Sequence, residues 1–398
     1  MKNNLVITRA KNQFLYDGKR KILDFSLSSG ALILGHTNSI FLNSLKRQIN
    51  KGSNYSNTNI NEVKFTKSLK ETFHEFNNFI FSNSGSEANM RALRIARSIT
   101  GKEKFGMVNG SWHGAIDNMM FDFKNTKYLD INKIRSLSSG INYAKKNVIL
   151  LPYNNIEKSK EILDKNYRKI SVIAIEPIQC GVPNKITKDY LIFLNNYCKK
   201  KKILLWFDEV ITGIRVKKFA IYKQLKLKPD MVTFAKCFGG GMPIGITLFN
   251  SKILKNKKKK IFFGGTFSGN PISTKVGLDT FNYIKKYKKR IDKHINDLSN
   301  MLVNEINSFC NIHNKEFKLQ SYETIVRPIF TSKNINNKFF REKFDPYFKN
   351  SLNLKNYLIK KNIFISSNCA FFISYCHNVN DINNLINELK KFILKNCN

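Results

Sequence analysis

The sequence predicts an α/β protein whose core is a mostly parallel β-sheet. Three short apolar segments, residues 172–175, 203–207 and 231–235, have the length and composition of buried strands. An amphipathic segment over residues 187–202 separates the first two and predicts a helix that connects parallel strands. Each apolar segment ends at polar residues. In open α/β sheets the carboxyl ends of the strands form the ligand-binding edge, so we expect the functional site there.

The segments before this core follow the same alternation. Residues 79–82 predict a strand, and a turn rich in Ser and Gly connects it to a helix predicted over residues 87–100. Gly101 is the expected stop of that helix. We expect three parts: an N-terminal segment (residues 1–47) that joins the smaller domain, a large ligand-binding domain (residues 48–275), and a smaller C-terminal α+β domain (residues 276–398).

The basic composition raises the alternative of a non-catalytic basic protein that binds nucleic acid. The 398 residues carry a formal net charge of +40, and clustered lysines bind phosphate backbones. Here the lysines are spread over the whole chain, with short runs only at residues 199–202 and 257–260. No interleaving of Arg with aromatic residues accompanies those runs. A general bias of the composition toward Lys, Asn, Ile and Phe accounts for the charge. We therefore expect the lysines to form a solvated protein surface and expect no nucleic-acid partner.

Composition also bears on location and on metals. The N-terminus has no apolar signal region, and no stretch approaches the roughly 20 apolar residues of a membrane span. The seven cysteines are scattered, without the CxxC spacing of a zinc or redox site. We therefore expect a cytoplasmic protein with free thiols, no metal and no membrane partner.

Two segments have the composition of phosphate-binding loops. At residues 84–87, Ser-Gly-Ser-Glu opens the predicted helix, where Gly85 permits close backbone approach and free N–H groups attract an anion. Helix capping alone explains the same residues. Residues 264–271 form a second glycine-rich loop with two hydroxyls, which is either a phosphate donor or a plain turn.

Two charged residues end apolar strands. Asp208 follows a buried strand, where a carboxylate needs a cationic partner: the pyridinium nitrogen of a cofactor, or an Arg or Lys in a salt bridge. Lys236 follows another such strand and precedes a Gly-Gly-Gly segment that leaves room for a bulky ligand. Burial lowers the pKa of a lysine and favours Schiff-base chemistry, although one buried lysine proves little in a lysine-rich chain.

Taken together, these segments resemble the class III aminotransferases, and within them the glutamate-1-semialdehyde 2,1-aminomutase subfamily. Each motif alone is weak evidence for the family, but the order and spacing of the motifs are specific. The resemblance extends over nearly the whole chain. The matching segments are residues 34–36 (Leu-Gly-His), 83–89 (Asn-Ser-Gly-Ser-Glu-Ala-Asn), 110–114 (Gly-Ser-Trp-His-Gly), 175–178 (Ile-Glu-Pro-Ile), 207–216, 238–243 and 265–271. The resemblance implies an aspartate-aminotransferase-like fold (fold type I) whose large domain binds pyridoxal 5'-phosphate (PLP).

The resemblance also implies how the cofactor phosphate is held. Gly85 and Ser86 hold it through the backbone and a hydroxyl. Thr266 resembles the residue that reaches the phosphate bound by the neighbouring subunit, so a homodimer is implied. Glu176 and Glu209 match family motifs as structural or supporting residues.

Four further residues resemble those that hold the cofactor ring. Trp112, where the family usually has Tyr or Phe, stacks on one face, and Val210 covers the other. Asp208 binds the ring nitrogen, and Lys236 forms an imine with the cofactor. Lys236 and Asp208 are accordingly the predicted catalytic residues.

The departures from the aminomutase pattern lie in the substrate pocket. The sequence starts too late for the N-terminal segment with a substrate-binding arginine. Ser29 lies where the aminomutase tends to read Gly-Ser-Trp-Gly-Pro, and Cys369 lies where it usually has an acidic residue. We therefore predict an aminotransferase that moves an amino group from a donor amino acid to a carbonyl substrate, such as a keto sugar, semialdehyde or amino ketone. Residues 138–141 resemble the mobile loop of the aminomutase, so the aminomutase is the alternative.

Arg327 is a further substrate candidate. It lies among apolar residues in a predicted strand, where the aminomutase tends to have a small residue. A guanidinium binds a carboxylate or phosphate bidentately, so Arg327 is a replacement anion clamp. The alternatives are a salt bridge with Glu323 or a solvent-facing position.

Overall fold

The computed structural model describes residues 5–123, 134–185, 187–254, 261–345, 347–366 and 370–397, with side chains 347–349 left out of the description. A seven-stranded sheet has the order β4-β12-β11-β10-β9-β5-β8. Only β12 runs antiparallel to its neighbours, so the predicted mostly parallel sheet is confirmed. Its strands are β4 (Asn78–Ser82), β5 (Lys104–Val108), β8 (Val148–Leu151), β9 (Ile170–Ile175), β10 (Leu204–Asp208), β11 (Met231–Ala235) and β12 (Gly245–Phe249).

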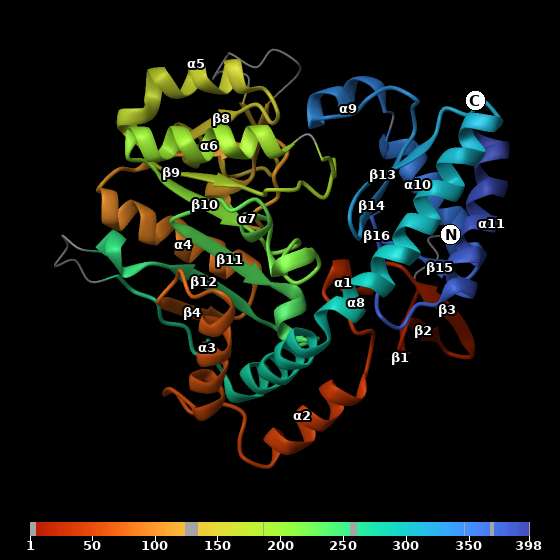
Figure 1. The fold of residues 1–398 in the computed structure, drawn as a ribbon, viewed down its shortest axis with the longest axis horizontal. Coiled ribbons are helices and arrows are strands. Elements are labelled where there is room, and N and C mark those ends of the chain that lie inside the picture. The colour runs from red at the N-terminus through yellow and green to blue at the C-terminus, as the bar shows by residue number, and fades with distance from the viewer. Residues whose placement is uncertain are drawn as a thin grey trace.

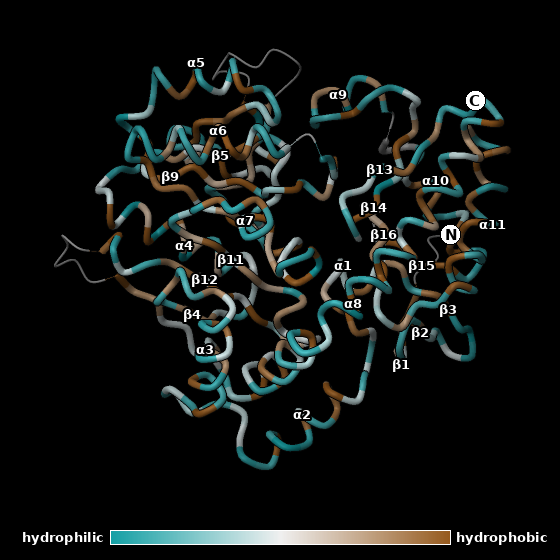
Figure 2. Tube along the Cα trace, in the orientation of Figure 1, coloured by the Kyte–Doolittle hydropathy of each residue, from teal (hydrophilic) through white to brown (hydrophobic). Residues whose placement is uncertain are grey.

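Helices cover both faces of this sheet. The helix α4 (Gly85–Thr100) packs with Trp206 on one face, and α6 (Thr187–Lys201) packs with Leu205 and Phe207 on the other. Successive residues of a strand point to opposite faces, which is why β10 contributes to both apolar layers. All of β9 is buried, as expected for a central strand between two helical layers. Figure 2 shows the strands mainly in hydrophobic colours, whereas the helices alternate.

The remaining helices are spread along the chain. The helix α8 (Pro271–Ile312) runs from the region of the large sheet to the C-terminal region, with non-helical backbone at Tyr287, and the predicted domain boundary at residue 275 lies near its start (Figure 1). The other α-helices of the described residues are α1 (Leu27–Gly30), α2 (Ser39–Ile49), α3 (Ile60–Thr72), α5 (Ile156–Asn166), α7 (Ile221–Gln224), α8 (Pro271–Ile312), α9 (Lys338–Phe344), α10 (Tyr347–Lys360) and α11 (Val379–Asn396).

Three smaller sheets complete the fold. The N-terminal strand β3 (Arg20–Asp24) pairs with β15 (Ile363–Phe364), so the start of the chain packs with its C-terminal third (Figure 1). The sheets are β1 (Arg9–Lys11), β2 (Phe14–Asp17), β3 (Arg20–Asp24) and β15 (Ile363–Phe364); β13 (Lys318–Tyr322), β14 (Ile325–Ile329) and β16 (Phe371–Phe372); and β6 (Phe121–Phe123) with β7 (Ile134–Ser136).

Two findings concern location and thiols. Across the described ranges, no helix combines the length and the apolar character that a membrane span requires. Six cysteines in those ranges are free thiols. Cys369, the seventh, lies outside the described residues.

Candidate active site

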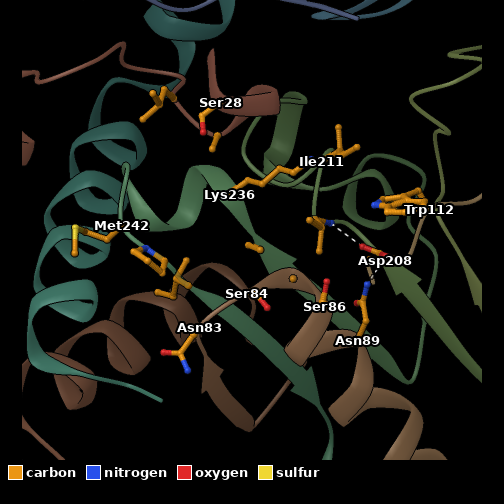
Figure 3. Close-up of a pocket in the computed structure, with 18 of the residues that line it drawn as sticks. Ser28, Asn83, Ser84, Ser86, Asn89, Trp112, Asp208, Ile211, Lys236 and Met242 are labelled. Atoms are coloured by element: carbon orange, nitrogen blue, oxygen red, sulfur yellow. Dashed lines mark hydrogen bonds between the residues drawn. The ribbon is translucent and has the colours of Figure 1, made fainter. Parts of the chain in front are cut away.

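Three neighbouring strands bring charged residues to the same edge of the large sheet. Asp208 is the last residue of β10, Lys236 directly follows β11, and Glu176 directly follows β9. The three strands are parallel and adjacent, so their carboxyl ends meet. A cavity of about 390 Å³ lies at this edge (Figure 3). Its lining includes six of the predicted residues: Gly85, Ser86, Trp112, Asp208, Val210 and Lys236.

The N-terminus of α4 forms one wall of this cavity. Ser84 caps the helix, because its hydroxyl accepts a 3.1 Å hydrogen bond from the backbone N–H of Glu87. The Ser86 hydroxyl accepts one from the N–H of Ala115, also at 3.1 Å. At Gly85 a Cβ would lie 3.0 Å from a methyl of Val210, so a larger residue would fit only if Val210 shifted. Backbone N–H groups and the positive end of the helix dipole meet the cavity here and favour a phosphate.

Asp208 is held by three hydrogen bonds and is only 2% exposed. Its Oδ1 accepts from the N–H of Val210 at 3.0 Å. Its Oδ2 accepts from Nδ2 of Asn89 at 2.7 Å and lies 2.8 Å from Nδ1 of His113 (Figure 3 shows the bond to Asn89). Sequence reasoning assigned no role to Asn89 or His113, although both lie inside the motifs that carried the resemblance. These contacts fix the orientation of the carboxylate toward the cavity.

Lys236 has an unusual backbone as well as an unusual environment. Its φ is 50°, a left-handed conformation that costs an L-residue roughly 1–2 kcal/mol. Burial lowers the pKa of its ammonium group, and the nearby Cys180, Glu176 and Asp208 oppose that shift only in part. A lysine with a lowered pKa presents more of the neutral, nucleophilic amine at neutral pH. Figure 3 shows its side chain inside the cavity, between Ser28 and Ser86.

Trp112 has an exposed indole ring beside a buried carboxyl. The ring lines the cavity and is 54% exposed, so it is no part of the core. Its backbone N–H donates to Oε2 of Glu176 at 3.2 Å, and the N–H of Cys180 donates to Oε1 at 3.3 Å. Glu176 therefore supports the loop that carries Trp112.

The two motif glutamates are buried and carry raised pKa values. Burial, with a smaller contribution from Asp208, raises the pKa of Glu176 to about 8. Burial also raises the pKa of Glu209 to about 7. The Glu209 carboxylate accepts the N–H groups of Ile221 and Tyr222, both at 3.0 Å, and does not line the cavity. These contacts fit the structural role expected for Glu209.

Glu176→Gln is expected to flatten the pH dependence of stability. Between the unfolded pKa of 4.5 and the folded value of about 8, folded Glu176 keeps a proton that the unfolded chain has lost. The free energy of unfolding therefore falls as pH rises, by up to ~1.4 kcal/mol per pH unit from this group. Glutamine cannot titrate and removes this slope. Urea unfolding at pH 5.5, 6.5 and 7.5 measures it, with the exposed Glu316→Gln as control. Equal slopes for Glu176→Gln and wild type would contradict the shift.

Three of the other predicted residues do not line the cavity. Ser29 is exposed but does not line the cavity, whereas its neighbour Ser28 does. Thr266 is exposed on the loop before α8, and its carbonyl accepts a 3.0 Å hydrogen bond from Asn54. Arg327 is 3% exposed at the centre of β14, in the strand predicted for it. Cys369, as noted, falls outside the described residues.

With this geometry in place, sequence comparison identifies the family. Residues 1–318 match the model of the family described as aminotransferase class-III. The chain belongs to the class III aminotransferase family. It is 33% identical over 302 residues to a glutamate-1-semialdehyde 2,1-aminomutase of Methanococcus maripaludis, a match covering 74% of this chain and 70% of the relative. It is 33% identical over 303 residues to the enzyme of the same name from Archaeoglobus fulgidus, covering 75% and 71%.

Solved structures confirm the predicted fold. An ω-transaminase from Sphaerobacter thermophilus superposes with a TM-score of 0.88 at 19% identity, over 98% of this chain and 90% of that one. A transaminase with PLP bound superposes with a TM-score of 0.85 at 20% identity, over 98% and 91%. This class III chain therefore has the predicted fold type I architecture, and its family consists of PLP-dependent enzymes. The alternative of a non-catalytic basic protein is set aside.

Proposed function

We propose that this class III chain is a PLP-dependent aminotransferase with Lys236 and Asp208 as its catalytic residues. One observation carries the proposal. The register of β10 and β11 brings Asp208 and Lys236 to one cavity, and the N-terminus of α4 forms another wall of that cavity. Gly85 and Ser86 are suited to hold the cofactor phosphate.

Each remaining role follows from what the side chain offers. When bound, PLP supplies a protonated ring that accepts the electrons released beside the substrate amine. Asp208 offers a fixed carboxylate to the ring nitrogen. Trp112 and Val210 offer apolar surfaces to the two ring faces. Lys236 would hold the cofactor covalently through Nζ, and the same amine, once the substrate amine has displaced it, would move a proton from one carbon to the other.

We favour a separate amino donor, with the aminomutase reaction as the second candidate. The names of the curated relatives support the aminomutase. The altered segment at residues 27–31, which includes the cavity-lining Ser28, supports a changed carbonyl substrate. Stoichiometry separates the two, because an aminotransferase consumes a donor amino acid and an aminomutase consumes none. Mixing cofactor-loaded protein with candidate donors and following the cofactor absorbance is the test.

The proposal includes a cytoplasmic homodimer. Free thiols in the described residues fit a reducing compartment. Thr266 lies in a loop whose Phe262 and Phe267 side chains are 72% and 61% exposed, and exposed aromatic residues favour a protein interface. Because Thr266 lies outside the cavity of its own chain, a phosphate contact requires the second subunit.

A mixed dimer of Thr266→Ala and Lys236→Ala chains tests the role of Thr266. If the loop acts across the interface, the site with wild-type Lys236 receives the intact loop of the Lys236→Ala chain, and the other site combines mutant Lys236 with a mutant loop. Full cofactor retention is expected at the site that retains Lys236, whereas the Thr266→Ala homodimer is expected to lose cofactor at both sites. Cofactor loss at the Lys236-bearing site of the mixed dimer, or a monomer in solution, would contradict the proposal. Dialysis followed by absorbance of the purified mixed dimer measures retention.

Arg327 remains the proposed anion clamp for the substrate. Among the described residues lining the cavity, Lys236 is the one cation, so an anionic substrate needs a cation from beyond that lining. Burial raises the pKa of the Cys180 thiol, and the charges of Arg327 and Lys236 both oppose that shift. The guanidinium thus lies within electrostatic reach of the active-site region. The carboxylate of Glu323, the partner considered above, accepts from the N–H of Lys217 at 2.8 Å.

Arg327→Ala is expected to raise the Michaelis constant for an anionic substrate about 30-fold. Losing a charged hydrogen bond costs ~2 kcal/mol, which corresponds to that factor. Arg327→Lys keeps the charge without the planar fork, so an intermediate value is expected. Cofactor binding is expected to stay normal in both variants. Steady-state kinetics provide the measurement. An unchanged constant together with a lower melting temperature would show that Arg327 is structural.

A further inference from the structure

The wall of the cavity that carries Ser28 is the short element α1, whose backbone is a left-handed turn and not a right-handed helix. Leu27, Ser28 and Ser29 have φ values of 45°, 53° and 56°, and Gly30 follows with φ 84°. L-residues adopt this conformation singly and rarely in succession, because Cβ crowds the following carbonyl oxygen. Strained backbone persists only where surrounding contacts impose it. The surroundings of this turn therefore have to be identified.

Asp24 holds the start of the turn. Its Oδ1 accepts the N–H groups of Ser26 at 2.7 Å and Leu27 at 3.0 Å. Within the turn, the N–H of Gly30 donates to the carbonyl of Ser26 at 2.9 Å. The N–H of Ala31 donates to the carbonyl of Leu27, also at 2.9 Å. These contacts fix the first residues of the turn and its internal geometry. The carbonyl of Gly30, at the end of the turn, is held by other segments.

Arg215 holds this end of the turn. Its Nε donates to the carbonyl of Gly30 at 2.8 Å, and the thiol of Cys237 donates to the same oxygen at 3.2 Å. Nη1 of Arg215 donates to the carbonyl of Ile373 at 3.2 Å, and the guanidinium lies 4.9 Å from the centre of the Phe372 ring. Arg215 thereby connects the loop after β10, the left-handed turn and the segment around β16.

The environment of Arg215 is costly for stability alone. The side chain is 0% exposed, and burial lowers its pKa. No carboxylate of the described residues forms an ion pair with it, and Nη2 has no hydrogen-bond partner among them. Replacing a buried charge by an apolar side chain is often neutral or stabilising. A buried cation whose two named hydrogen bonds both go to carbonyls of distant segments calls for a role other than bulk stability.

We propose that Arg215 is a positioning residue that imposes the left-handed turn and so sets the Ser28 side chain into the cavity wall. The inference rests on the proposed function, because the cavity is the site assigned to the reaction. Figure 3 shows Ser28 on the opposite side of Lys236 from Ser84 and Ser86. That end of the cavity lies away from the proposed phosphate cradle, and in the proposed reaction the substrate would bind there. Without Arg215 the turn relaxes toward ordinary backbone, and the Ser28 hydroxyl leaves the wall.

Hydrogen–deuterium exchange of the cofactor-loaded enzyme tests this proposal. Arg215→Met removes the Nε and Nη1 groups that donate to Gly30 and Ile373, and methionine still fills the site with a long apolar side chain. The amides of Gly30, Ala31 and Leu32 are expected to exchange about tenfold faster or more, equivalent to ~1.4 kcal/mol of local stability. Amides of residues 204–208 in β10 serve as the internal control and are expected to stay unchanged. If the methionine variant does not fold, Arg215→Lys replaces it. Lysine keeps the positive charge but lacks the planar N–H donors of the guanidinium group.

A glycine rescue separates positioning from general packing. Ser29 is exposed and does not line the cavity, and glycine adopts its left-handed φ without steric cost. Ser29→Gly in the Arg215→Met background is expected to restore protection of the turn, whereas Ser29→Ala in the same background is not. Unchanged exchange in Arg215→Met, faster exchange that extends to β10, or equal rescue by alanine would overturn the proposal. Failure of the proposed function is a separate result, seen as wild-type protein that binds no PLP.

Discussion

Lys236→Ala is expected to abolish turnover while the protein stays folded. In the proposed mechanism one amine both binds the cofactor covalently and moves the proton, and a positioned acid–base group alone contributes about 10²–10⁴-fold to a rate. Loss of both roles places the expected decrease in kcat at about 10³-fold or more. The absorbance band of the lysine-bound cofactor is expected to disappear. Single-turnover kinetics and an absorbance spectrum of the purified variant measure these effects.

Lys288→Ala is the matched control for Lys236. Lys288 is also a lysine whose pKa burial lowers, but it pairs with Asp292 in α8. The control is expected to lower stability and to leave the cofactor band in place. Turnover of Lys236→Ala within tenfold of wild type would show that another residue binds the cofactor.

Asp208→Asn is expected to retain PLP and to lose about 10²-fold or more in kcat. A carboxylate beside the ring nitrogen favours the protonated ring, and each pKa unit of that preference corresponds to ~1.4 kcal/mol. The amide has the same shape but no charge, so the ring loses its capacity to accept electrons. The donors Asn89 and His113 also face an amide that accepts through one oxygen only. Steady-state kinetics and the pH dependence of the cofactor spectrum measure the change.

Asp230→Asn provides the control for Asp208. Asp230 directly precedes β11 and accepts the N–H of Leu205 at 2.8 Å, so it lies at the opposite edge of the same sheet. Its replacement is expected to affect folding stability and to leave the cofactor spectrum unchanged. If Asp208→Asn keeps both its activity and its spectrum, Asp208 is a structural carboxylate and the proposed mechanism is wrong.

Much of the sheet was predictable because its signals are local. β11 has the predicted ends, and β10 and α6 begin or end within one residue of theirs. Apolar runs and helical spacing act within a few residues, so the sequence records them directly. The positions of Asp208 and Lys236 at strand ends follow from the same signals. Their convergence follows from parallel strands, whose carboxyl ends share one edge.

The partners of Asp208 were not predictable in the same way. Asn89 and His113 lie 119 and 95 positions away along the chain. Nothing in the periodicity of α4, or of the loop after β5, indicates which carboxylate they meet. Strand order and register decide that pairing, and both depend on packing over the whole sheet.

The sequence by itself determined the α/β class, the family and the residues at the strand ends, because hydrophobic periodicity and motif order can be read directly from the order of the residues. Only the tertiary structure decided that Ser28, and not Ser29, lines the cavity. Two adjacent serines are equivalent to any local rule. The left-handed turn that separates them is imposed by Asp24 and by Arg215, which lies 185 positions beyond Gly30. Such a conformation is unfavourable locally, so it exists only where distant contacts supply the free energy that local sequence does not.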